Sequence, residues 1–495
     1  MKKTIMIQGT MSNAGKSLLT AGLCRVFNQD GYSVAPFKSQ NMALNSYITD
    51  EGFEMSRAQA VQAEAAGIPP DILMNPILLK PITDMGAQVI VNGEVFRNMN
   101  ATEYFDYKKT LVPYIMRAFE TLSNRHDIVV IEGAGSPAEI NLRQNDIVNM
   151  GLAKMTNAPV LLVGDIDRGG VFAQLVGTLA LLEDEERDRI KGLIINKFRG
   201  DIELLRPGLA MLEEKAGKPV VGTIPYLSVD IEDEDSLSER FHRKWAPSVL
   251  DIAVIKFPKI SNHTDFMALE ATDSIGLRYV SDVDMLGQPD MIILPGTKSA
   301  ISDLKWLREN GLEAAILRLA SEGVIIFGIC GGYQMLGQSI KDSEKAQGGG
   351  EINGLGLLPV VTEVCAEKTR LRTAGEVVGA TGALSLLNSV SLAGYEIHTG
   401  VSRFVEKTAP LVIKEGNCAD GCALGNIAGT YLHGFFDSDD CRSALIKALC
   451  ARKGISTPSG VFDFSAYKNE QYNKLADAVR ENLDMELIYK IIRGS

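Results

Sequence analysis

The stretch Thr4-Ile-Met-Ile-Gln-Gly-Thr-Met-Ser-Asn-Ala-Gly-Lys-Ser17 decides the fold of the N-terminal part of the chain. The apolar run 4–8 predicts a buried strand, and the apolar periodicity of 18–27 predicts a helix. The loop between them ends in Gly-Lys-Ser, and this order of strand, loop and helix is typical of a phosphate-binding P-loop. A chance Gly-Lys-Ser at the start of a helix is the alternative interpretation.

The loop predicts ATP and Mg²⁺ as cofactors. Backbone N–H groups of a P-loop face phosphate oxygens, so we expect Asn13 and Gly15 at the phosphates. Lys16 is expected to neutralise the β- and γ-phosphate oxygens, and the Ser17 hydroxyl is expected to reach Mg²⁺. The standard spacing would place the first glycine at Thr10, also a predicted nucleotide-binding residue, whereas the chain has it one position earlier.

A carboxylate follows a second apolar run. Glu132 comes directly after 127–131, and the carboxyl ends of parallel strands lie at the same edge of a sheet as a P-loop. Phosphoryl transfer needs a carboxylate for the metal, so we expect Glu132 and Ser17 to bind Mg²⁺. A turn residue in the glycine-rich loop that follows is the alternative.

Two further predicted strands end in polar residues. Asp165 and Asp167 follow the run 160–163. We expect them to bind either metal or substrate, and a position without any binding role is the alternative. Asn196 and Lys197 end the next run and resemble the base-reading pair of nucleotide-binding domains. A cap at the end of a strand is the alternative for this pair.

Short apolar runs alternate with helical patterns along the whole chain, which predicts an α/β protein of two domains with mostly parallel sheets. We expect an ATP-binding domain over 1–231 and a linker over 232–250, where a charged run begins. A second domain over 251–445 and a C-terminal helical extension over 446–495 complete the prediction. The expected strands are 4–8, 33–37, 127–131, 160–163, 192–195, 220–222, 251–257, 291–294, 323–327, 394–398, 411–413 and 427–432.

Composition excludes several classes of protein. The 495 residues include 50 Lys and Arg against 62 Asp and Glu, a formal net charge of −12 that argues against nucleic-acid and polybasic membrane partners. The longest apolar runs are far shorter than a membrane span. The seven cysteines are scattered, which supports neither a disulfide framework nor a zinc site. We therefore expect a cytoplasmic protein; its oligomeric state does not follow from the sequence.

The second predicted domain carries a candidate nucleophile. The apolar run 323–329 ends in Gly328-Ile-Cys330-Gly-Gly332, which is the cysteine form of the nucleophile elbow between a strand and a helix. The N–H of Gly331 would face a developing oxyanion, and a helix N-terminus favours the thiolate over the thiol. A buried structural cysteine is the alternative.

A nucleophilic cysteine needs a base, and histidine is the usual one. His433 and His398 each end an apolar run of the second domain, and position alone does not choose between them. The run 291–294 leads into Pro295-Gly296, and Gly296 is a candidate second oxyanion donor.

The sequence resembles the family of cobyric acid and cobyrinic acid diamide synthases over about 1–440, and within it the cobyric acid branch. Its N-terminal half is similar to the dethiobiotin synthetase type of P-loop domain, and its second half to triad-class glutamine amidotransferases. The sister diamide synthases carry an acidic segment where this chain has Gln40-Asn41. The motifs that carry the resemblance are Phe37-Lys-Ser-Gln-Asn-Met-Ala-Leu-Asn-Ser46, Met55-Ser-Arg-Ala-Gln59, Met74-Asn-Pro-Ile-Leu-Leu-Lys-Pro81, Glu132-Gly-Ala-Gly-Ser-Pro-Ala-Glu-Ile-Asn-Leu142 and Asp165-Ile-Asp-Arg-Gly-Gly-Val-Phe172.

The resemblance implies Cys330 as the nucleophile and His433 as its base. Most triad amidotransferases have Glu two residues after this histidine, whereas this chain has Phe435. The candidates for a third residue are Asp437 and Glu396, and a Cys–His dyad is the alternative. The residues expected to line the corrinoid site are Gln40, Asn41, Asn45 and Gln59, with loop and helix capping as the alternative for each.

The implied reaction is the ATP- and glutamine-dependent amidation of four peripheral carboxylates of (adenosyl)cobyrinic acid a,c-diamide, which gives (adenosyl)cobyric acid in cobalamin biosynthesis. It passes through acyl phosphates and uses ammonia released from a cysteine thioester, so the corrinoid and glutamine are the expected partners. The alternatives are a diamide synthase that acts on other corrinoid carboxylates, a ligase that uses free ammonia, and a non-catalytic P-loop switch protein.

Overall fold

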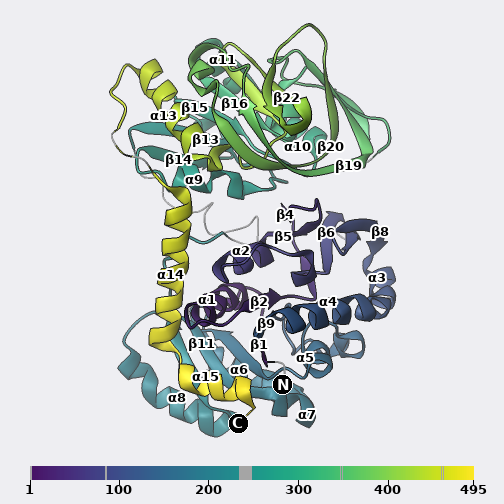
Figure 1. Cartoon of the computed structure of the whole chain (residues 1–495), viewed down its shortest axis with the longest axis vertical. Helices are drawn as coiled ribbons and strands as arrows, with labels where there is room; N and C mark the ends of the chain where they lie inside the picture. Colours follow the sequence, from purple (N-terminus) through teal and green to yellow (C-terminus); the bar gives the residue numbers. More distant parts are fainter. Residues whose placement is uncertain are drawn as a thin grey trace. The chain divides into compact units, whose positions relative to one another are not determined.

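The computed structural model describes residues 3–83, 86–232, 248–345, 347, 349–458, 460 and 462–494. The chain divides into two compact units (Figure 1). Unit 1 contains 1–49, 53–234 and 465–495, and unit 2 contains 50–52 and 235–464. Most of the predicted linker 232–250, namely 233–247, lies outside the described residues.

Unit 1 is built on a six-stranded parallel sheet in the order β12-β11-β10-β1-β9-β2. The central strands are runs of buried aliphatic residues, as expected for a parallel sheet that is covered on both faces. A strand confirms each of the six runs predicted for this part of the chain. The bounds are β1 (Lys3–Gly9), β2 (Val34–Phe37), β9 (Ile128–Glu132), β10 (Val160–Asp165), β11 (Ile190–Phe198) and β12 (Val220–Pro225).

Each face of this sheet has its own hydrophobic core. Alternate residues of β1 point to opposite faces, so Ile5 and Ile7 pack with α1 and Met6 packs in a separate cluster with α4. This arrangement puts the carboxyl ends of the strands, and the loops after them, at one edge. The helices of the unit are α1 (Lys16–Gln29), α2 (Arg57–Ala65), α3 (Ala101–Tyr107), α4 (Val112–Arg125), α5 (Met150–Thr156), α6 (Val171–Leu181), α7 (Asp184–Arg189) and α8 (Ile202–Ala216).

Two small sheets between β2 and α3 were not predicted from the sequence. One is four-stranded in the order β3-β6-β7-β8, and the other pairs β4 with β5. Strands β3, β4 and β5 have only three residues, too few to show a period, while Lys80 and Pro81 interrupt the apolar run of β6 and most of β8 is exposed. Their bounds are β3 (Gln40–Met42), β4 (Ser46–Ile48), β5 (Glu54–Ser56), β6 (Ile77–Thr83), β7 (Gly86–Val91) and β8 (Glu94–Asn100).

The C-terminal residues 465–495 belong to unit 1, and they form most of α14 (Phe464–Asn482) and all of α15 (Met485–Arg493). These helices, yellow in Figure 1, pack on α1 and share a core with it. A Cβ on Gly22 of α1 would lie 2.7 Å from Cγ2 of Val479, so the absence of a side chain allows this close packing. The N–H of Asp484 donates to the carbonyl of Val221 at 2.8 Å.

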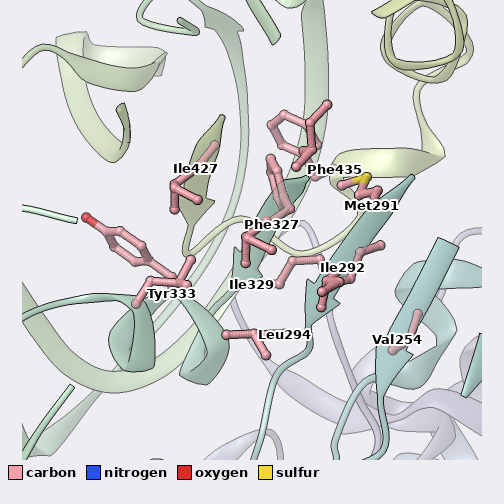
Figure 2. Packing of buried hydrophobic residues seen from close by; sticks show 14 of the residues in the cluster. Val254, Met291, Ile292, Leu294, Phe327, Ile329, Tyr333, Ile427 and Phe435 are labelled. Carbon is pink, nitrogen blue, oxygen red and sulfur yellow. The ribbon is translucent and has the colours of Figure 1, made fainter. Parts of the chain in front are cut away.

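Unit 2 contains a mixed sheet whose parallel part has the order β14-β13-β15-β16-β23. Figure 2 shows its core, in which Ile292 and Leu294 of β15 lie beside Phe327 and Ile329 of β16. Antiparallel strands and the long hairpin of β19 and β20 extend the sheet. The parallel strands are β13 (Leu250–Ile255), β14 (Ile275–Val280), β15 (Met291–Leu294), β16 (Ile325–Ile329) and β23 (Ile427–Thr430).

The remaining strands and the helices of unit 2 complete the predicted two-domain α/β fold, which is confirmed, although about half of the strand pairs in this unit are antiparallel. The other strands are β17 (Ser339–Asp342), β18 (Gly350–Asn353), β19 (Val360–Val377), β20 (Ser391–Phe404), β21 (Pro410–Lys414) and β22 (Cys418–Leu424). The helices are α9 (Met267–Glu270), α10 (Ala300–Glu309), α11 (Leu312–Ser321), α12 (Gly331–Leu336) and α13 (Asp439–Lys453). In the part of the chain that the structure describes, we find no helix with the length and apolarity of a membrane span.

Candidate active sites

The loop between β1 and α1 has the backbone of a phosphate cradle. Gly15 has a φ of 96°, in the left-handed region that favours glycine. A Cβ at this position would lie 2.0 Å from Nδ2 of Asn196, so a larger residue would collide as well as strain the backbone. Nδ2 of Asn196 donates to the carbonyl of Ala14 at 2.9 Å. The end of β11 therefore contacts the loop, and base reading by Asn196 stays a prediction.

Lys16 begins α1 and its side chain folds back over the loop. Its Nζ donates to the carbonyl of Met11 at 3.0 Å and to that of Gly135 at 3.1 Å. Gly135 belongs to the glycine-rich turn that follows β9. The ammonium group thus lies between the two loops that border the edge of the sheet, where its charge can meet phosphate oxygens.

Ser17 and Glu132 lie side by side, because β1 and β9 are parallel neighbours in the sheet. The Ser17 hydroxyl donates to Oε1 of Glu132 at 2.7 Å, and the Glu132 side chain is fully buried. No cluster of three His, Cys, Asp or Glu side chains suited to a metal occurs among the described residues. One hydroxyl and one carboxylate fit Mg²⁺ nevertheless, since this ion commonly takes its other ligands from phosphates and water.

Three further side chains converge on Glu132. Lys38 directly follows β2, and its Nζ lies 2.8 Å from Oε1. Gln59 and Gln62 of α2 donate to Oε2 at 3.3 and 2.5 Å. The sequence analysis missed Lys38 and Gln62. Lys38 follows a predicted strand at the same edge as Glu132, which is a signal that could have identified it.

Most of the residues expected to line the corrinoid site are buried, and they form hydrogen bonds within the protein. Nδ2 of Asn41 donates to Oγ of Ser56 at 2.6 Å and to Oε1 of Gln59 at 3.2 Å. Gln40 accepts a hydrogen bond from the hydroxyl of Tyr104, and Asn45 is 1% exposed. Substrate contact by these residues stays a prediction.

The predicted polar residues at the ends of β10 and β11 contact one another. Nζ of Lys197 lies 3.1 Å from Oδ2 of the buried Asp165, whose Oδ1 accepts from the N–H of Asp167 at 2.9 Å. Arg199 bonds Oδ1 of Asp167 at 3.0 Å and lies over the ring of Tyr226. The same edge of the sheet thus offers charged and aromatic groups beside Asn196. Just after β1, Thr10 donates to Oε1 of Gln174 in α6 at 3.0 Å.

In unit 2 the sharp turn between β16 and α12 holds Cys330 in a strained conformation, with a φ of 51° and a ψ of −107°. The flanking glycines allow this turn. A Cβ on Gly332 would lie 1.9 Å from the carbonyl oxygen of Leu294, and one on Gly328 would lie 2.6 Å from the N–H nitrogen of Tyr333. The Cys330 thiol faces the carbonyl of Ile397, 3.7 Å from Sγ.

His433 is the histidine that interacts with Cys330. Its Nδ1 lies 2.7 Å from Oδ2 of Asp265, whose Oδ1 accepts the N–H of Gly434 at 3.1 Å. Burial alone would lower the pKa of His433, but the Asp265 carboxylate and the hydrogen bond with Cys330 raise this pKa to about 10. The ring of Tyr395 stacks on the imidazole with 5.1 Å between ring centres.

Asp265 is therefore the carboxylate that holds Nδ1 of His433, and the sequence analysis named Asp437 and Glu396 instead. Glu396 pairs with Lys414. Asp265 lies in the turn after β13, at the carboxyl edge of the parallel sheet. Aspartates that cap helices are common in such turns, so its position in the sequence does not distinguish it. Only the distance to His433 identifies its role.

His398 has other partners. Its Nδ1 bonds the carbonyl of Gly400 at 2.8 Å, and its ring stacks on Tyr431 with 3.8 Å between ring centres. These contacts orient the ring along the hairpin strand β20. The structure thus brings Cys330 together with His433, the histidine that the resemblance implied.

The two predicted oxyanion glycines border the cysteine. A Cβ on Gly331 would lie 3.1 Å from the N–H nitrogen of Thr297, and one on Gly296 would lie 3.1 Å from Cε1 of His433. The loop after β15 therefore runs between the elbow and the imidazole. Stabilisation of an oxyanion by the N–H groups of Gly331 and Gly296 stays a prediction.

Comparison with known proteins gives matches over both units. A model of the CobQ/CobB/MinD/ParA nucleotide binding domain matches 5–237, and one of the CobB/CobQ-like glutamine amidotransferase domain matches 251–441. The cobyric acid synthase of Lachnoclostridium phytofermentans is 58% identical, and the alignment covers 99% of both chains. That of Ruminiclostridium cellulolyticum is 56% identical over 99% of this chain and 97% of its own length.

Proposed function

The chain belongs to the cobyric acid synthase family, whose members carry out glutamine-dependent amidation in cobalamin biosynthesis, and from this premise we propose how its residues perform that reaction. The substrates are glutamine, ATP and (adenosyl)cobyrinic acid a,c-diamide. Four peripheral carboxylates of this corrinoid become amides. Two arrangements together carry the proposal. One is the Cys330–His433–Asp265 group in unit 2, and the other is the Ser17–Glu132 pair beside the P-loop in unit 1.

Unit 2 releases ammonia from glutamine. The Cys330 thiolate attacks the side-chain carbonyl carbon of glutamine, and His433 donates a proton to the departing nitrogen. Ammonia leaves, a thioester forms, and water activated by His433 then hydrolyses it to glutamate. Asp265 holds the imidazole in place and stabilises its protonated form, which accords with the raised pKa of His433. The N–H groups near Gly331 and Gly296 stabilise the oxyanion of each tetrahedral intermediate.

Unit 1 activates the carboxylate. The carboxylate oxygen of the corrinoid attacks the γ-phosphorus of ATP, which gives an acyl phosphate and ADP. Lys16 and Lys38 supply positive charge at the edge of the sheet, where negative charge accumulates on the transferred phosphoryl group. Bound Mg²⁺, held by Ser17 and Glu132, would neutralise phosphate charge. Asn196 donates to the carbonyl of Ala14 in the P-loop, and in this proposal Asn196 and Lys197 contact the nucleotide base.

Ammonia completes the reaction by attacking the acyl carbon, so that an amide forms and inorganic phosphate leaves. The carboxylates lie around the corrin ring, and one active site therefore has to meet them one after another. We propose that the corrinoid dissociates and rebinds in a new orientation between amidations. Partially amidated corrinoids free in solution support this proposal, whereas a reaction mixture that contains only substrate and final product contradicts it.

The decisive experiment is mass spectrometry of cobyrinic acid a,c-diamide incubated with the enzyme, ATP, Mg²⁺ and glutamine labelled with ¹⁵N in its amide. Successive mass changes that correspond to labelled amides and stop at four support the proposal. Amidation of other carboxylates would instead indicate a diamide synthase. Glutamine hydrolysis without any change of the corrinoid would contradict the proposed substrate.

A further inference from the structure

Two buried glutamine side chains of α2 hold the carboxylate of Glu132. Gln59 and Gln62 are three residues apart, so their side chains leave the same face of the helix. They are 0% and 1% exposed. Their Nε2 atoms lie 3.3 and 2.5 Å from Oε2 of Glu132, which leaves Oε1 to Ser17 and Lys38. The two oxygens of one carboxylate are thus assigned to different partners.

Amides suit a carboxylate that has to keep its charge. A buried carboxylate is costly unless hydrogen bonds and an opposite charge compensate it. Lys38 already supplies one positive charge to Glu132. Further cations would reduce the negative charge available to a metal ion, whereas neutral N–H donors fix Oε2 and leave that charge in place.

Gln62 also connects the two groups that are expected to bind Mg²⁺. Its Nε2 lies 3.3 Å from the carbonyl oxygen of Ser17, in addition to its bond with Glu132. One side chain therefore contacts the first turn of α1 and the end of β9. This double contact sets the spacing between the Ser17 hydroxyl and Oε1 of Glu132.

The other amide atoms of Gln59 and Gln62 also favour a specific role for these two side chains. Oε1 of Gln62 is buried without a hydrogen-bond partner in the described part of the chain, and leaving a buried polar atom unpaired destabilises the fold. A methionine would fill the same space without that cost. In Gln59, Nε2 is engaged by Glu132 and Oε1 by Asn41, so its amide is already bonded at both ends.

We propose that Gln59 and Gln62 form an amide clamp, defined by these two side chains, that positions Glu132 and Ser17 for Mg²⁺. This proposal rests on the proposed function and replaces the expectation that Gln59 contacts the corrinoid. Both are positioning residues, because they act through Glu132. Asn41 extends the clamp by holding Oε1 of Gln59 at 3.2 Å.

The test compares Gln59→Met and Gln62→Met, which keep the side-chain length and remove the N–H donors. Gln471→Met is the matched control, because Gln471 is a buried glutamine of unit 1 that bonds the N–H of Asp230 instead. Calorimetry measures the Kd of ATP in excess Mg²⁺ and again in EDTA. Kinetics with ammonia as nitrogen donor measure kcat and the KM for the corrinoid.

We expect both clamp variants to bind ATP in Mg²⁺ at least about tenfold more weakly than the wild type, the size of effect seen when a group that orients a metal ligand is lost. Their Kd in EDTA, their KM for the corrinoid and all values of Gln471→Met should match the wild type. A clamp variant with wild-type Mg²⁺ dependence overturns the proposal. So does a raised corrinoid KM with an unchanged Kd, which would make Gln59 a substrate contact. A wild type that neither binds ATP nor amidates the corrinoid would contradict the proposed function itself.

Discussion

Oδ2 of Asp265 lies 2.7 Å from Nδ1 of His433, although 168 positions separate the two residues in the chain. Both side chains are almost fully buried. The strands β13 and β23 belong to the same sheet, so the turns that follow them reach the same edge. This pair places beside His433 a carboxylate other than Asp437 and Glu396, the two candidates named from the sequence.

Replacement of Asp265 should impair glutamine hydrolysis. Asp265→Asn removes the charge that stabilises the His433 imidazolium, and we expect kcat to fall about 10²-fold, within the range for loss of acid–base assistance. A steady-state assay of glutamate release measures it. Amidation with free ammonia should remain normal. Asp437→Asn is the control, and an equal loss in that variant would contradict the assignment of Asp265.

The His433–Asp265 pair should make stability depend on pH. Burial would lower the pKa of His433, but Asp265 and Cys330 raise it to about 10 from an ordinary value of 6.5. Because the folded pKa is the higher one, the stabilisation is complete below pH 6.5 and is lost as the pH rises through about 10. Denaturant midpoints of the wild type and Asp265→Asn should therefore converge as the pH rises. A constant difference over this range would show that the pair does not titrate as expected.

Replacement of Cys330 should separate the two half-reactions. Cys330→Ser retains the turn but replaces the thiol with a hydroxyl that is far harder to ionise. We expect glutamine-dependent amidation to disappear while ammonia-dependent amidation persists. The measurement is amide formation with each nitrogen donor. Continued use of glutamine by the variant would exclude Cys330 as the nucleophile.

A side chain on Gly15 should weaken nucleotide binding. Gly15→Ala places a Cβ 2.0 Å from Nδ2 of Asn196 and strains a φ of 96°. Gly31→Ala is the matched control, because Gly31 has a φ of 87° and open space around its Cβ position. The conformational strain alone costs on the order of 1 kcal/mol in each variant. We expect calorimetry to show weakened ATP binding only in Gly15→Ala, and similar affinities for both variants would contradict the cradle geometry.

Loss of Lys38 should affect nucleotide chemistry as well as stability. Lys38→Met leaves the buried Glu132 without its cation, and an unpaired buried charge costs about 3–5 kcal/mol. Lys80→Met is the control, because Lys80 forms an equally buried pair with Glu54 at 2.7 Å. Both variants should unfold at lower denaturant concentration. Only Lys38→Met should also lose ammonia-driven amidation, and retention of that activity would remove Lys38 from the site.

The main elements of the fold could be predicted because each carries a local pattern. Most parallel strands of both units are short, buried aliphatic runs such as β1 and β16, and such runs alternate with helical patterns along the chain, whereas the half-buried β14 was not predicted. The small sheets formed by β3 and β4 and their partners were missed, since β3, β4 and β5 have only three residues and β8 is a largely exposed strand without a buried run. The association of 465–495 with α1 was also missed, because an amphipathic helix does not reveal which surface covers it.

Local sequence patterns identified the two motifs whose chemistry depends on the order of neighbouring residues. Gly15-Lys16-Ser17 after a strand and Gly328-Ile-Cys330-Gly after another are defined by backbone geometry within a few residues. Tertiary structure alone decided which distant side chains join them. Asp265 reaches His433, and Lys38, Gln59 and Gln62 reach Glu132, because parallel strands and the helices that cover them end at one edge. Hydrogen bonds are specific over about 3 Å, and only the packed fold brings groups that lie far apart in the chain within that distance.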